Sequence, residues 1–148
     1  MDDIKLVLIG TVGLPRSGKS TFAQAHGGPI VCPDAIRLAL HGQRFAPEAE
    51  PHVWAIAKTM VRALFHAGHK VVILDATNNT RKRRDAWIDG QWTTIWKVIE
   101  ADVDTCVIRA YRSDRQDIIP IIEKMAAEHE PLQDDEVAWG SIDKMASE

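Results

Sequence analysis

Residues 13–20 read Gly-Leu-Pro-Arg-Ser-Gly-Lys-Ser, which is a glycine, four further residues and then Gly-Lys-Ser. This spacing is typical of a phosphate-binding loop. Its glycines let backbone N–H groups turn toward an anion, its lysine reaches the β- and γ-phosphates, and its serine hydroxyl holds Mg²⁺. We therefore predict that this loop binds a nucleotide, that Lys19 is also catalytic and that Ser20 is the metal ligand. The predicted nucleotide contacts are Gly13, Pro15, Arg16, Ser17, Gly18, Lys19, Ser20 and Thr21.

The loop needs a strand before it and a helix after it, and the flanking sequence supplies both. Residues 4–9 predict the strand, and residues 21–26 predict the helix, whose N-terminus faces the phosphates. Further strands are expected at 29–32, 70–75 and 93–100, and helices at 35–41, about 47–67, 80–87, 104–111 and 118–129. This alternation favours an α/β fold of the P-loop NTPase type. We expect a three-layer sandwich, with a parallel sheet covered by helices on both faces and a helical lid at about 109–130.

Composition narrows the class of protein. The 148 residues fit a single domain, 1–148, with an acidic tail at about 133–148. No apolar run approaches the roughly 20 residues of a membrane span, so we expect no membrane contact and a cytoplasmic protein, in the host cytoplasm if it is viral. The net charge of −3 means that any nucleic-acid binding must be local. Cys32 and Cys106 have no metal-ligand spacing and are predicted to be reduced core residues.

Polar residues follow two of the predicted strands, where parallel sheets bind their ligands. Asp34 and Arg37 follow the second strand, and their spacing places both on one helix face. An aspartate here suits proton removal from an attacking hydroxyl, and the arginine suits an acceptor phosphate; a helix cap and a surface residue are the structural alternative. Asp75 ends a buried strand, where related enzymes keep a carboxylate that organises Mg²⁺. Thr77 and Asn78 add hydrogen-bonding groups to the same loop.

Two groups of basic residues extend this predicted site. Residues 81–84 read Arg-Lys-Arg-Arg at a predicted helix start, where the helix dipole disfavours cations, which indicates an anionic partner or simply a solvated face. Arg109, Arg112 and Arg115 recur every three residues in the predicted lid. An arginine in a segment that closes over ATP can stabilise the charge that develops in phosphoryl transfer.

These stretches together resemble the P-loop polynucleotide kinase family, which includes the kinase domain of bacteriophage polynucleotide 5′-kinase. The resemblance spans about residues 4–131 and is carried by Gly13–Thr21, Asp34-Ala-Ile-Arg37, Asp75-Ala-Thr-Asn78 and Arg83-Arg-Asp-Ala-Trp87. It implies that Lys19 and Ser20 bind ATP and Mg²⁺. It further implies that Asp34 is the general base, that Arg37 contacts the acceptor phosphate and that Asp75 supports the acceptor site. A lid arginine would clamp the phosphates of ATP, with Arg112 and Arg115 as the two candidates. The predicted substrate-binding residues are Asp34, Arg37, Thr77, Asn78, Arg81 and Arg84.

The predicted function is an ATP- and Mg²⁺-dependent kinase that transfers the γ-phosphate to a hydroxyl on nucleic acid. A 5′-OH polynucleotide kinase comes first, with DNA favoured over RNA. A bacteriophage-type kinase of 5-hydroxymethyluracil in DNA is close behind. The same scaffold also serves kinases of sugars, antibiotics and nucleotide-sugars. A nucleotide-binding switch with no acceptor is the alternative outside enzymes, although the chain lacks a guanine-reading Asn/Thr-Lys-x-Asp element.

Overall fold

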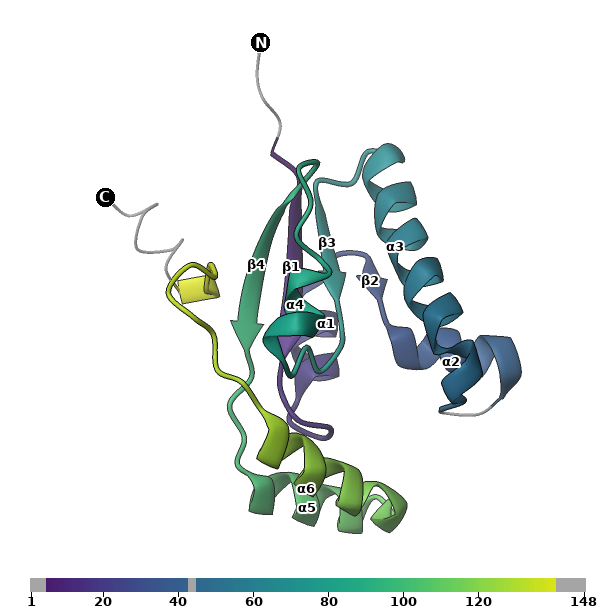
Figure 1. The fold of residues 1–148 in the computed structure, drawn as a ribbon, viewed down its shortest axis with the longest axis vertical. Helices are drawn as coiled ribbons and strands as arrows, with labels where there is room; N and C mark the ends of the chain where they lie inside the picture. Colours follow the sequence, from purple (N-terminus) through teal and green to yellow (C-terminus); the bar gives the residue numbers. More distant parts are fainter. Residues whose placement is uncertain (1–4, 43–44, 141–148) are drawn as a thin grey trace.

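A four-stranded parallel sheet forms the centre of the computed structural model, which describes residues 5–42 and 45–140. The strands are β1 (Val7–Val12), β2 (Ile30–Val31), β3 (Val71–Leu74) and β4 (Thr93–Val98), in the spatial order β2-β3-β1-β4 (Figure 1). Leu8 of β1 lies level with Val72 of β3 and Thr94 of β4, and every pair is parallel. The predicted α/β fold with a parallel sheet is confirmed.

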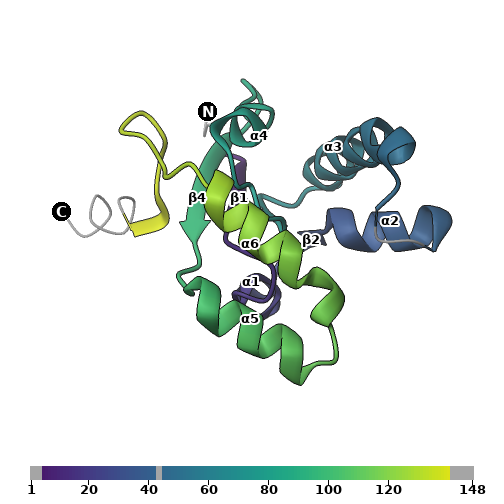
Figure 2. The same ribbon diagram turned by 60° about the horizontal axis from the view of Figure 1, so that its bottom comes forward.

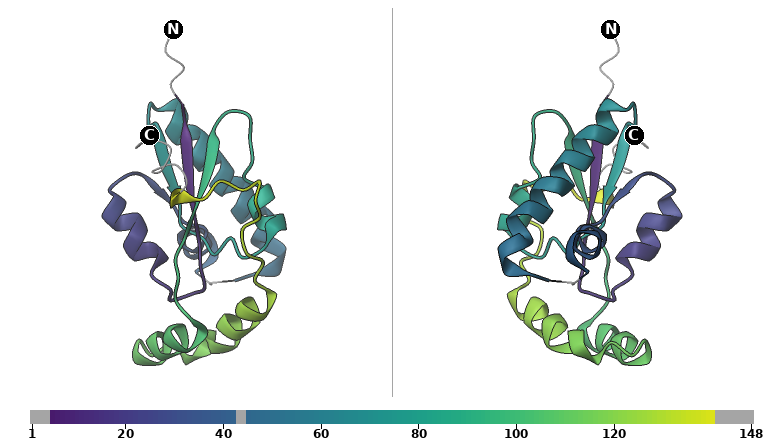
Figure 3. Two further views of the ribbon diagram at one scale, coloured as in Figure 1. Left: turned by 90° about the vertical axis from the view of Figure 1, so that its left-hand side faces the viewer. Right: turned by 90° about the vertical axis from the view of Figure 1, so that its right-hand side faces the viewer.

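Helices cover both faces of this sheet. Along β1 and β3, alternate side chains point to opposite faces. Ile9 and Ile73 pack with Ala23 of α1 (Lys19–His26), whereas Leu8 and Val72 belong to a larger core with α3 (Glu50–His66). Figure 3 shows α1 and α3 on opposite sides of the sheet. The short helix α4 (Arg81–Asp85) is followed by Trp87, which joins the α3 core.

The largest core also depends on a glycine in β1. A Cβ atom at Gly10 would lie 2.3 Å from Cζ3 of Trp96, a side chain that is almost completely buried. The indole ring therefore lies directly against the backbone of the neighbouring strand. This close approach requires the absence of a side chain at position 10.

The remaining helices lie at or beyond the carboxyl end of the sheet. Helix α2 (Pro33–His41) follows β2, and the 3₁₀ turn η1 (Pro47–Ala49) leads into α3. Helices α5 (Val103–Arg112) and α6 (Ile119–Glu128), joined through the 3₁₀ turn η2 (Gln116–Ile118), form a pair below the strand ends (Figures 1 and 2). The pair has its own small core of Cys106, Ala110 and Ile122. The predicted lid at about 109–130 overlaps this pair, which begins earlier, at Val103, and ends at Glu128.

Several element boundaries differ from the sequence prediction. Strand β1 begins at Val7 and runs on to Val12, because its last residues pair with β4 as far as Val98. Residue 4, where the strand was predicted to start, lies outside the described residues. Of the predicted reduced core cysteines, which are both free, Cys106 is fully buried and Cys32 is half-buried.

The described part of the predicted acidic tail packs on the edge of the sheet. The backbone N–H of Trp96 donates to the Val137 carbonyl at 2.9 Å, and Trp96 forms a parallel bridge with Ala138. The Trp139 ring meets Phe22 of α1 edge-on, with 5.8 Å between ring centroids. Residues 141–148 of the tail lie outside the described residues. Among the helices described here, none has the length and apolarity needed to cross a membrane.

Candidate active site

The loop of residues 13–18 joins β1 to α1 at the carboxyl end of the sheet. Arg16 and Gly18 have φ angles of 68° and 113°, and such left-handed residues let neighbouring N–H groups point into one concavity. A Cβ atom at Gly13 would lie 2.6 Å from Oγ of Ser17. The Ser17 hydroxyl is itself buried and has no hydrogen-bond partner among the described residues. The loop thus has a concave backbone that depends on glycine, and the unpaired Ser17 hydroxyl is available as a hydrogen-bond donor to a phosphate group.

Lys19 opens α1 and turns its ammonium group back over this loop. Its Nζ atom donates to the Leu14 carbonyl at 2.6 Å. Burial lowers the pKa of Lys19, while the charges of Asp75 and Asp34 act in the opposite direction. A partly desolvated ammonium with one neutral acceptor gains free energy when an anion binds beside it. Lys19 therefore fits the predicted role of binding nucleotide phosphates.

The hydroxyl of Ser20 is joined to the carboxylate that ends β3. Ser20 Oγ donates to Oδ2 of Asp75 at 2.7 Å, and Asp75 is only 8% exposed. Mg²⁺ prefers such oxygen ligands and binds through one or two protein groups together with substrate phosphates. Among the described residues no cluster of three or more histidine, cysteine, aspartate or glutamate side chains forms a complete metal cage. This pair therefore fits Mg²⁺ brought with a nucleotide, and it places Asp75 next to the predicted metal ligand.

Asp34 and Arg37 lie on α2 and are in contact, as their spacing predicts. Arg37 Nη1 is 2.6 Å from Oδ1 of Asp34, whose side chain is 79% exposed. Arg37 also donates through Nε and Nη2 to the two carboxylate oxygens of Glu50, at 2.9 and 2.7 Å. Burial is the largest single influence and lowers the pKa of Arg37, but Glu50 and Asp34 together outweigh it and the net pKa is raised. Glu50 therefore holds the guanidinium in place and leaves Asp34 open to solvent.

Glu50 was not predicted from the sequence. It lies 13 residues after Arg37, at the start of α3, and no motif joins the two positions. An acidic residue in the first turn of a helix is ordinarily explained by the helix dipole. Only the packing of α2 against α3 shows that this carboxylate is the partner of a predicted site residue.

The loop after Asp75 is used mainly to hold the phosphate-binding loop in place. The Thr77 carbonyl accepts from the N–H of Gly13 at 3.1 Å. Asn78 has a φ of 43°, which asparagine tolerates better than most residues, and its Nδ2 donates to the Thr11 carbonyl at 2.8 Å. The Oδ1 atom of Asn78 is buried and has no partner among the described residues. Thr77 and Asn78 thus lie beside the nucleotide loop, with one amide oxygen left for a further contact.

The two α4 arginines that were predicted to bind substrate are instead engaged by the C-terminal segment. Arg84 is completely buried and forms ion-paired hydrogen bonds of 2.7 and 3.2 Å with Glu136. Its guanidinium also donates to the carbonyls of Asn78 and Pro131. This burial argues against the prediction that Arg84 binds substrate, because the sequence showed a basic run but not the acidic segment that packs over it. Arg81 is half-buried and pairs bidentately with Asp135 at 2.7 Å.

Of the three lid arginines, the one that reaches the phosphate-binding loop is Arg109. Its Nη1 donates to the carbonyls of Arg16 and Ser17 at 3.1 and 3.2 Å. Arg115 pairs with Asp117 at 2.8 Å. The Arg112 side chain makes no hydrogen bond or ion pair with any described residue. A cavity of about 820 Å³ extends from the loop to α5 and α6, with Arg109 in its wall.

The fold and this site define the protein as a phosphotransferase of the P-loop kinase class. Residues 8–130 match the family AAA_33, described as an AAA domain, and the chain belongs to that family. The membership of a P-loop kinase family that the motifs predicted is thereby confirmed. No curated protein matches the sequence.

Several solved structures share the fold. The chain is 28% identical to a chain of the Pnkp1/Rnl/Hen1 complex, with a TM-score of 0.63, over 71% of this chain and 39% of that one. A chain of the Pnkp1/Rnl/Hen1 RNA repair complex is 20% identical, with a TM-score of 0.63, over 85% of this chain and 47% of that one. A gluconokinase from Sinorhizobium meliloti 1021 is 17% identical, with a TM-score of 0.56, over 93% of this chain and 83% of the gluconokinase chain. The chain thus spans less than half the length of the two Pnkp1/Rnl/Hen1 chains.

Proposed function

We propose that the protein is an ATP- and Mg²⁺-dependent kinase that phosphorylates a hydroxyl group of nucleic acid, with a 5′-OH end as the acceptor. The observation that carries this proposal is the position of Asp34. The charge of Asp34 acts on Lys19 of the phosphate-binding loop, while the Asp34 carboxylate is largely exposed and, among the described residues, pairs only with Arg37. This arrangement supports Asp34 as a proton acceptor that is open to an incoming alcohol near the nucleotide phosphates.

The residues divide the reaction as follows. Asp34 removes the proton from the acceptor hydroxyl as its oxygen bonds to the γ-phosphorus of ATP, and the bond from that phosphorus to the β,γ-bridging oxygen breaks, releasing ADP. Lys19 and an arginine of the α5–α6 pair stabilise the charge on the transferred group. We assign this arginine to Arg109, because it already contacts the loop, while Arg112 and Arg115 remain the positions predicted from the sequence. Ser20, with Asp75 hydrogen-bonded to it, would hold Mg²⁺, and the ion would supply positive charge that neutralises the phosphates.

The nucleic-acid acceptor is supported by Arg37 and by the relatives. Glu50 fixes the guanidinium of Arg37 beside Asp34, where it can bind the phosphate that follows the terminal nucleoside. The similarity to Pnkp1/Rnl/Hen1 chains points to the same class of acceptor, and one of these complexes is an RNA repair complex. RNA is therefore a candidate acceptor in addition to DNA, which the sequence favoured, and both should be assayed.

A small-molecule acceptor is the second candidate, and the sugar-kinase neighbours favour it. The chain covers 83% of the S. meliloti gluconokinase and 82% of a sugar kinase from Janibacter sp. HTCC2649. A neutral sugar does not need the cations around Asp34. Salt separates the two candidates, because binding to a polyanion weakens steeply as salt is added, whereas binding to a neutral sugar does not and binding to the singly charged gluconate weakens much less.

An acceptor screen with γ-labelled ATP tests the proposal. The acceptors are single-stranded DNA and RNA with 5′-OH ends, duplex DNA containing hydroxymethyluracil, nucleosides, and gluconate. Asp34→Asn should lose at least about a hundredfold in kcat, because general base catalysis contributes roughly that much or more. Asp104→Asn is the matched control, since Asp104 is also an exposed aspartate in the first turn of a helix and does not line the cavity at the loop. Label found only as free phosphate, or near-normal transfer by Asp34→Asn, would overturn the assignment.

A further inference from the structure

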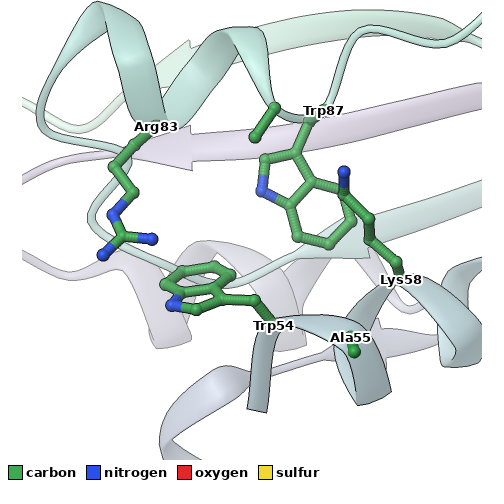
Figure 4. Close-up of a pocket in the computed structure, with 6 residues that line it drawn as sticks. Trp54, Ala55, Lys58, Arg83 and Trp87 are labelled. Atoms are coloured by element: carbon green, nitrogen blue, oxygen red, sulfur yellow. The ribbon is translucent and has the colours of Figure 1, made fainter. Parts of the chain in front are cut away.

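A second cavity lies between α3 and α4, outside the phosphate-binding loop. Its volume is about 310 Å³, and it is lined by Trp54, Ala55, Lys58, Arg83, Ala86 and Trp87 (Figure 4). Trp87 is almost fully buried and forms a wall, whereas Trp54 is half-buried and Arg83 is exposed. Two indole rings and two cations therefore border one open hollow.

The two cations of this cavity are held against aromatic rings rather than against carboxylates. The Arg83 guanidinium carbon is 4.7 Å from the centroid of the Trp54 ring, and Lys58 Nζ is 5.7 Å from that of Trp87. Neither cation forms an ion pair with a carboxylate among the described residues, unlike Arg81 and Arg84 on the same helix as Arg83. The positive charge of the cavity is therefore available to an anion from outside.

Trp54 also has a donor without an acceptor. Its Nε1 atom is buried, and no described residue accepts a hydrogen bond from it. A buried indole N–H ordinarily has a partner, because leaving it unpaired costs free energy. A ligand that brings an acceptor oxygen or nitrogen to this edge of the cavity would remove that cost.

Trp54 connects the wall of this cavity to the acceptor side of the candidate active site. The Arg37 guanidinium carbon is 5.8 Å from the centroid of the Trp54 ring, which the Arg83 guanidinium also contacts. Arg37 in turn holds Asp34 at 2.6 Å. A chain of groups thus leads from the candidate base through Arg37 and Trp54 to Arg83.

We propose that this cavity binds a nucleotide unit of the acceptor strand next to its 5′-terminal nucleotide. The phosphate on the 3′ side of this nucleotide, one beyond the phosphate assigned to Arg37, lies by Arg83 and Lys58, and the base packs on the exposed part of Trp54. Single-stranded nucleic acids bind to surfaces that combine cations with an exposed aromatic ring. A neutral sugar has no negative charge to pair with either cation. This inference rests on the proposed nucleic-acid acceptor. It adds a surface that binds the acceptor strand beyond its 5′-terminal nucleotide.

Equilibrium binding of 3′-fluorescein-labelled oligonucleotides to the full chain tests this site without catalysis. Fluorescence anisotropy with a single-stranded 5′-OH hexanucleotide gives Kd for the wild type, Arg83→Ala and Lys58→Ala. Lys82→Ala is the matched control, because Lys82 is an exposed cation in the same basic run but does not line the cavity. We expect Arg83→Ala to weaken binding about tenfold or more, the cost of one charged phosphate contact, and Lys82→Ala less than about twofold.

Two further measurements sharpen the outcome. Trp54→Phe keeps an aromatic face and removes the N–H, and it should weaken hexanucleotide binding while the thermal unfolding midpoint shows that the variant is folded. In kinase assays, the rise in KM caused by Arg83→Ala should shrink when the hexanucleotide is replaced by a nucleoside 3′-phosphate.

The failure of this site can be told apart from failure of the proposed function. If the wild type phosphorylates oligonucleotides and Arg83→Ala binds them as tightly as the wild type, the subsite is refuted and the kinase assignment stands. Equal losses in Arg83→Ala and Lys82→Ala also refute it, because they indicate general attraction of a polyanion. If the wild type neither binds nor phosphorylates oligonucleotides but phosphorylates gluconate, both proposals fail.

Discussion

Replacing Glu136 with glutamine removes the charge that neutralises the fully buried guanidinium of Arg84. The Arg84 side chain is 0% exposed and that of Glu136 is 4% exposed, so solvent cannot take over the lost interaction. Two hydrogen bonds of 2.7 and 3.2 Å join the two side chains, and the carbonyls of Asn78 and Pro131 accept the others. Glutamine keeps the shape and one acceptor but leaves a buried positive charge without a counter-charge.

The expected cost follows from that burial. Removing one partner of a buried ion pair typically costs about 3–5 kcal/mol. We take the lower end, about 3 kcal/mol, because two carbonyl acceptors remain. For a chain of this size each kcal/mol shifts the unfolding midpoint by roughly 2–4 °C, so Glu136→Gln should lower Tm by about 6–12 °C.

Thermal and urea unfolding followed by circular dichroism measure this change. Asp135→Asn is the matched control, because Asp135 is the neighbouring residue, is 66% exposed and pairs with Arg81, and solvent screens such an exposed pair so that it contributes little to stability. The double variant Arg84→Met/Glu136→Leu removes both charges and should recover at least half of the loss. A Glu136→Gln protein within about 1 kcal/mol of wild type, or a double variant that is less stable than the single one, would refute the reasoning.

Three further predictions use other contacts. Gly10→Ala should cost about 1–3 kcal/mol in urea unfolding because its Cβ would meet the Trp96 ring, whereas Gly90→Ala, whose Cβ meets nothing within 4 Å, should change little. Ser17→Ala should weaken ATP binding, measured by calorimetry, while leaving Tm unchanged, because the buried Ser17 hydroxyl has no partner among the described residues to lose. Burial raises the pKa of Cys106, so the unfolded chain loses that thiol proton first, and stability should fall as the pH rises past the ordinary thiol value. Mass-spectrometric mapping of iodoacetamide labelling at pH 8 should show slow reaction at Cys106 in buffer and fast reaction in urea.

Much of the candidate site followed from local patterns in the sequence. Residues 13–20 form a loop that joins a strand to a helix, as the motif requires, and Lys19 and Ser20 lie at the start of α1. The three-residue spacing of Asp34 and Arg37 placed them on one helix face, and they are in contact. Asp75 was expected at the end of a buried strand and lies there, joined to Ser20. Each of these relations depends on a fixed repeat or on the rule that parallel strands end at one edge.

The contacts that decide which arginines are available depend on residues far apart in the chain. From the basic run of α4 the sequence analysis selected Arg81 and Arg84 as substrate-binding residues, yet Arg84 is buried by Glu136, which is 52 residues away, and Arg83 lies against Trp54. Of the three lid arginines the family resemblance favoured Arg112 and Arg115, and only the packing of α5 brings Arg109 to the loop. Charge and spacing are local properties, whereas burial and ion pairing arise when distant segments meet.

The amino-acid sequence by itself determined the strand–loop–helix unit that binds phosphate and the alternating pattern that makes a parallel sheet, because both depend on backbone conformation and short-range periodicity. The tertiary structure decided that Glu50 holds Arg37, that the C-terminal segment neutralises Arg81 and Arg84, and that α3 and α4 enclose a cationic, aromatic cavity. A side chain's environment is set by the elements that pack around it, and the sequence does not show which elements those are until the chain has folded.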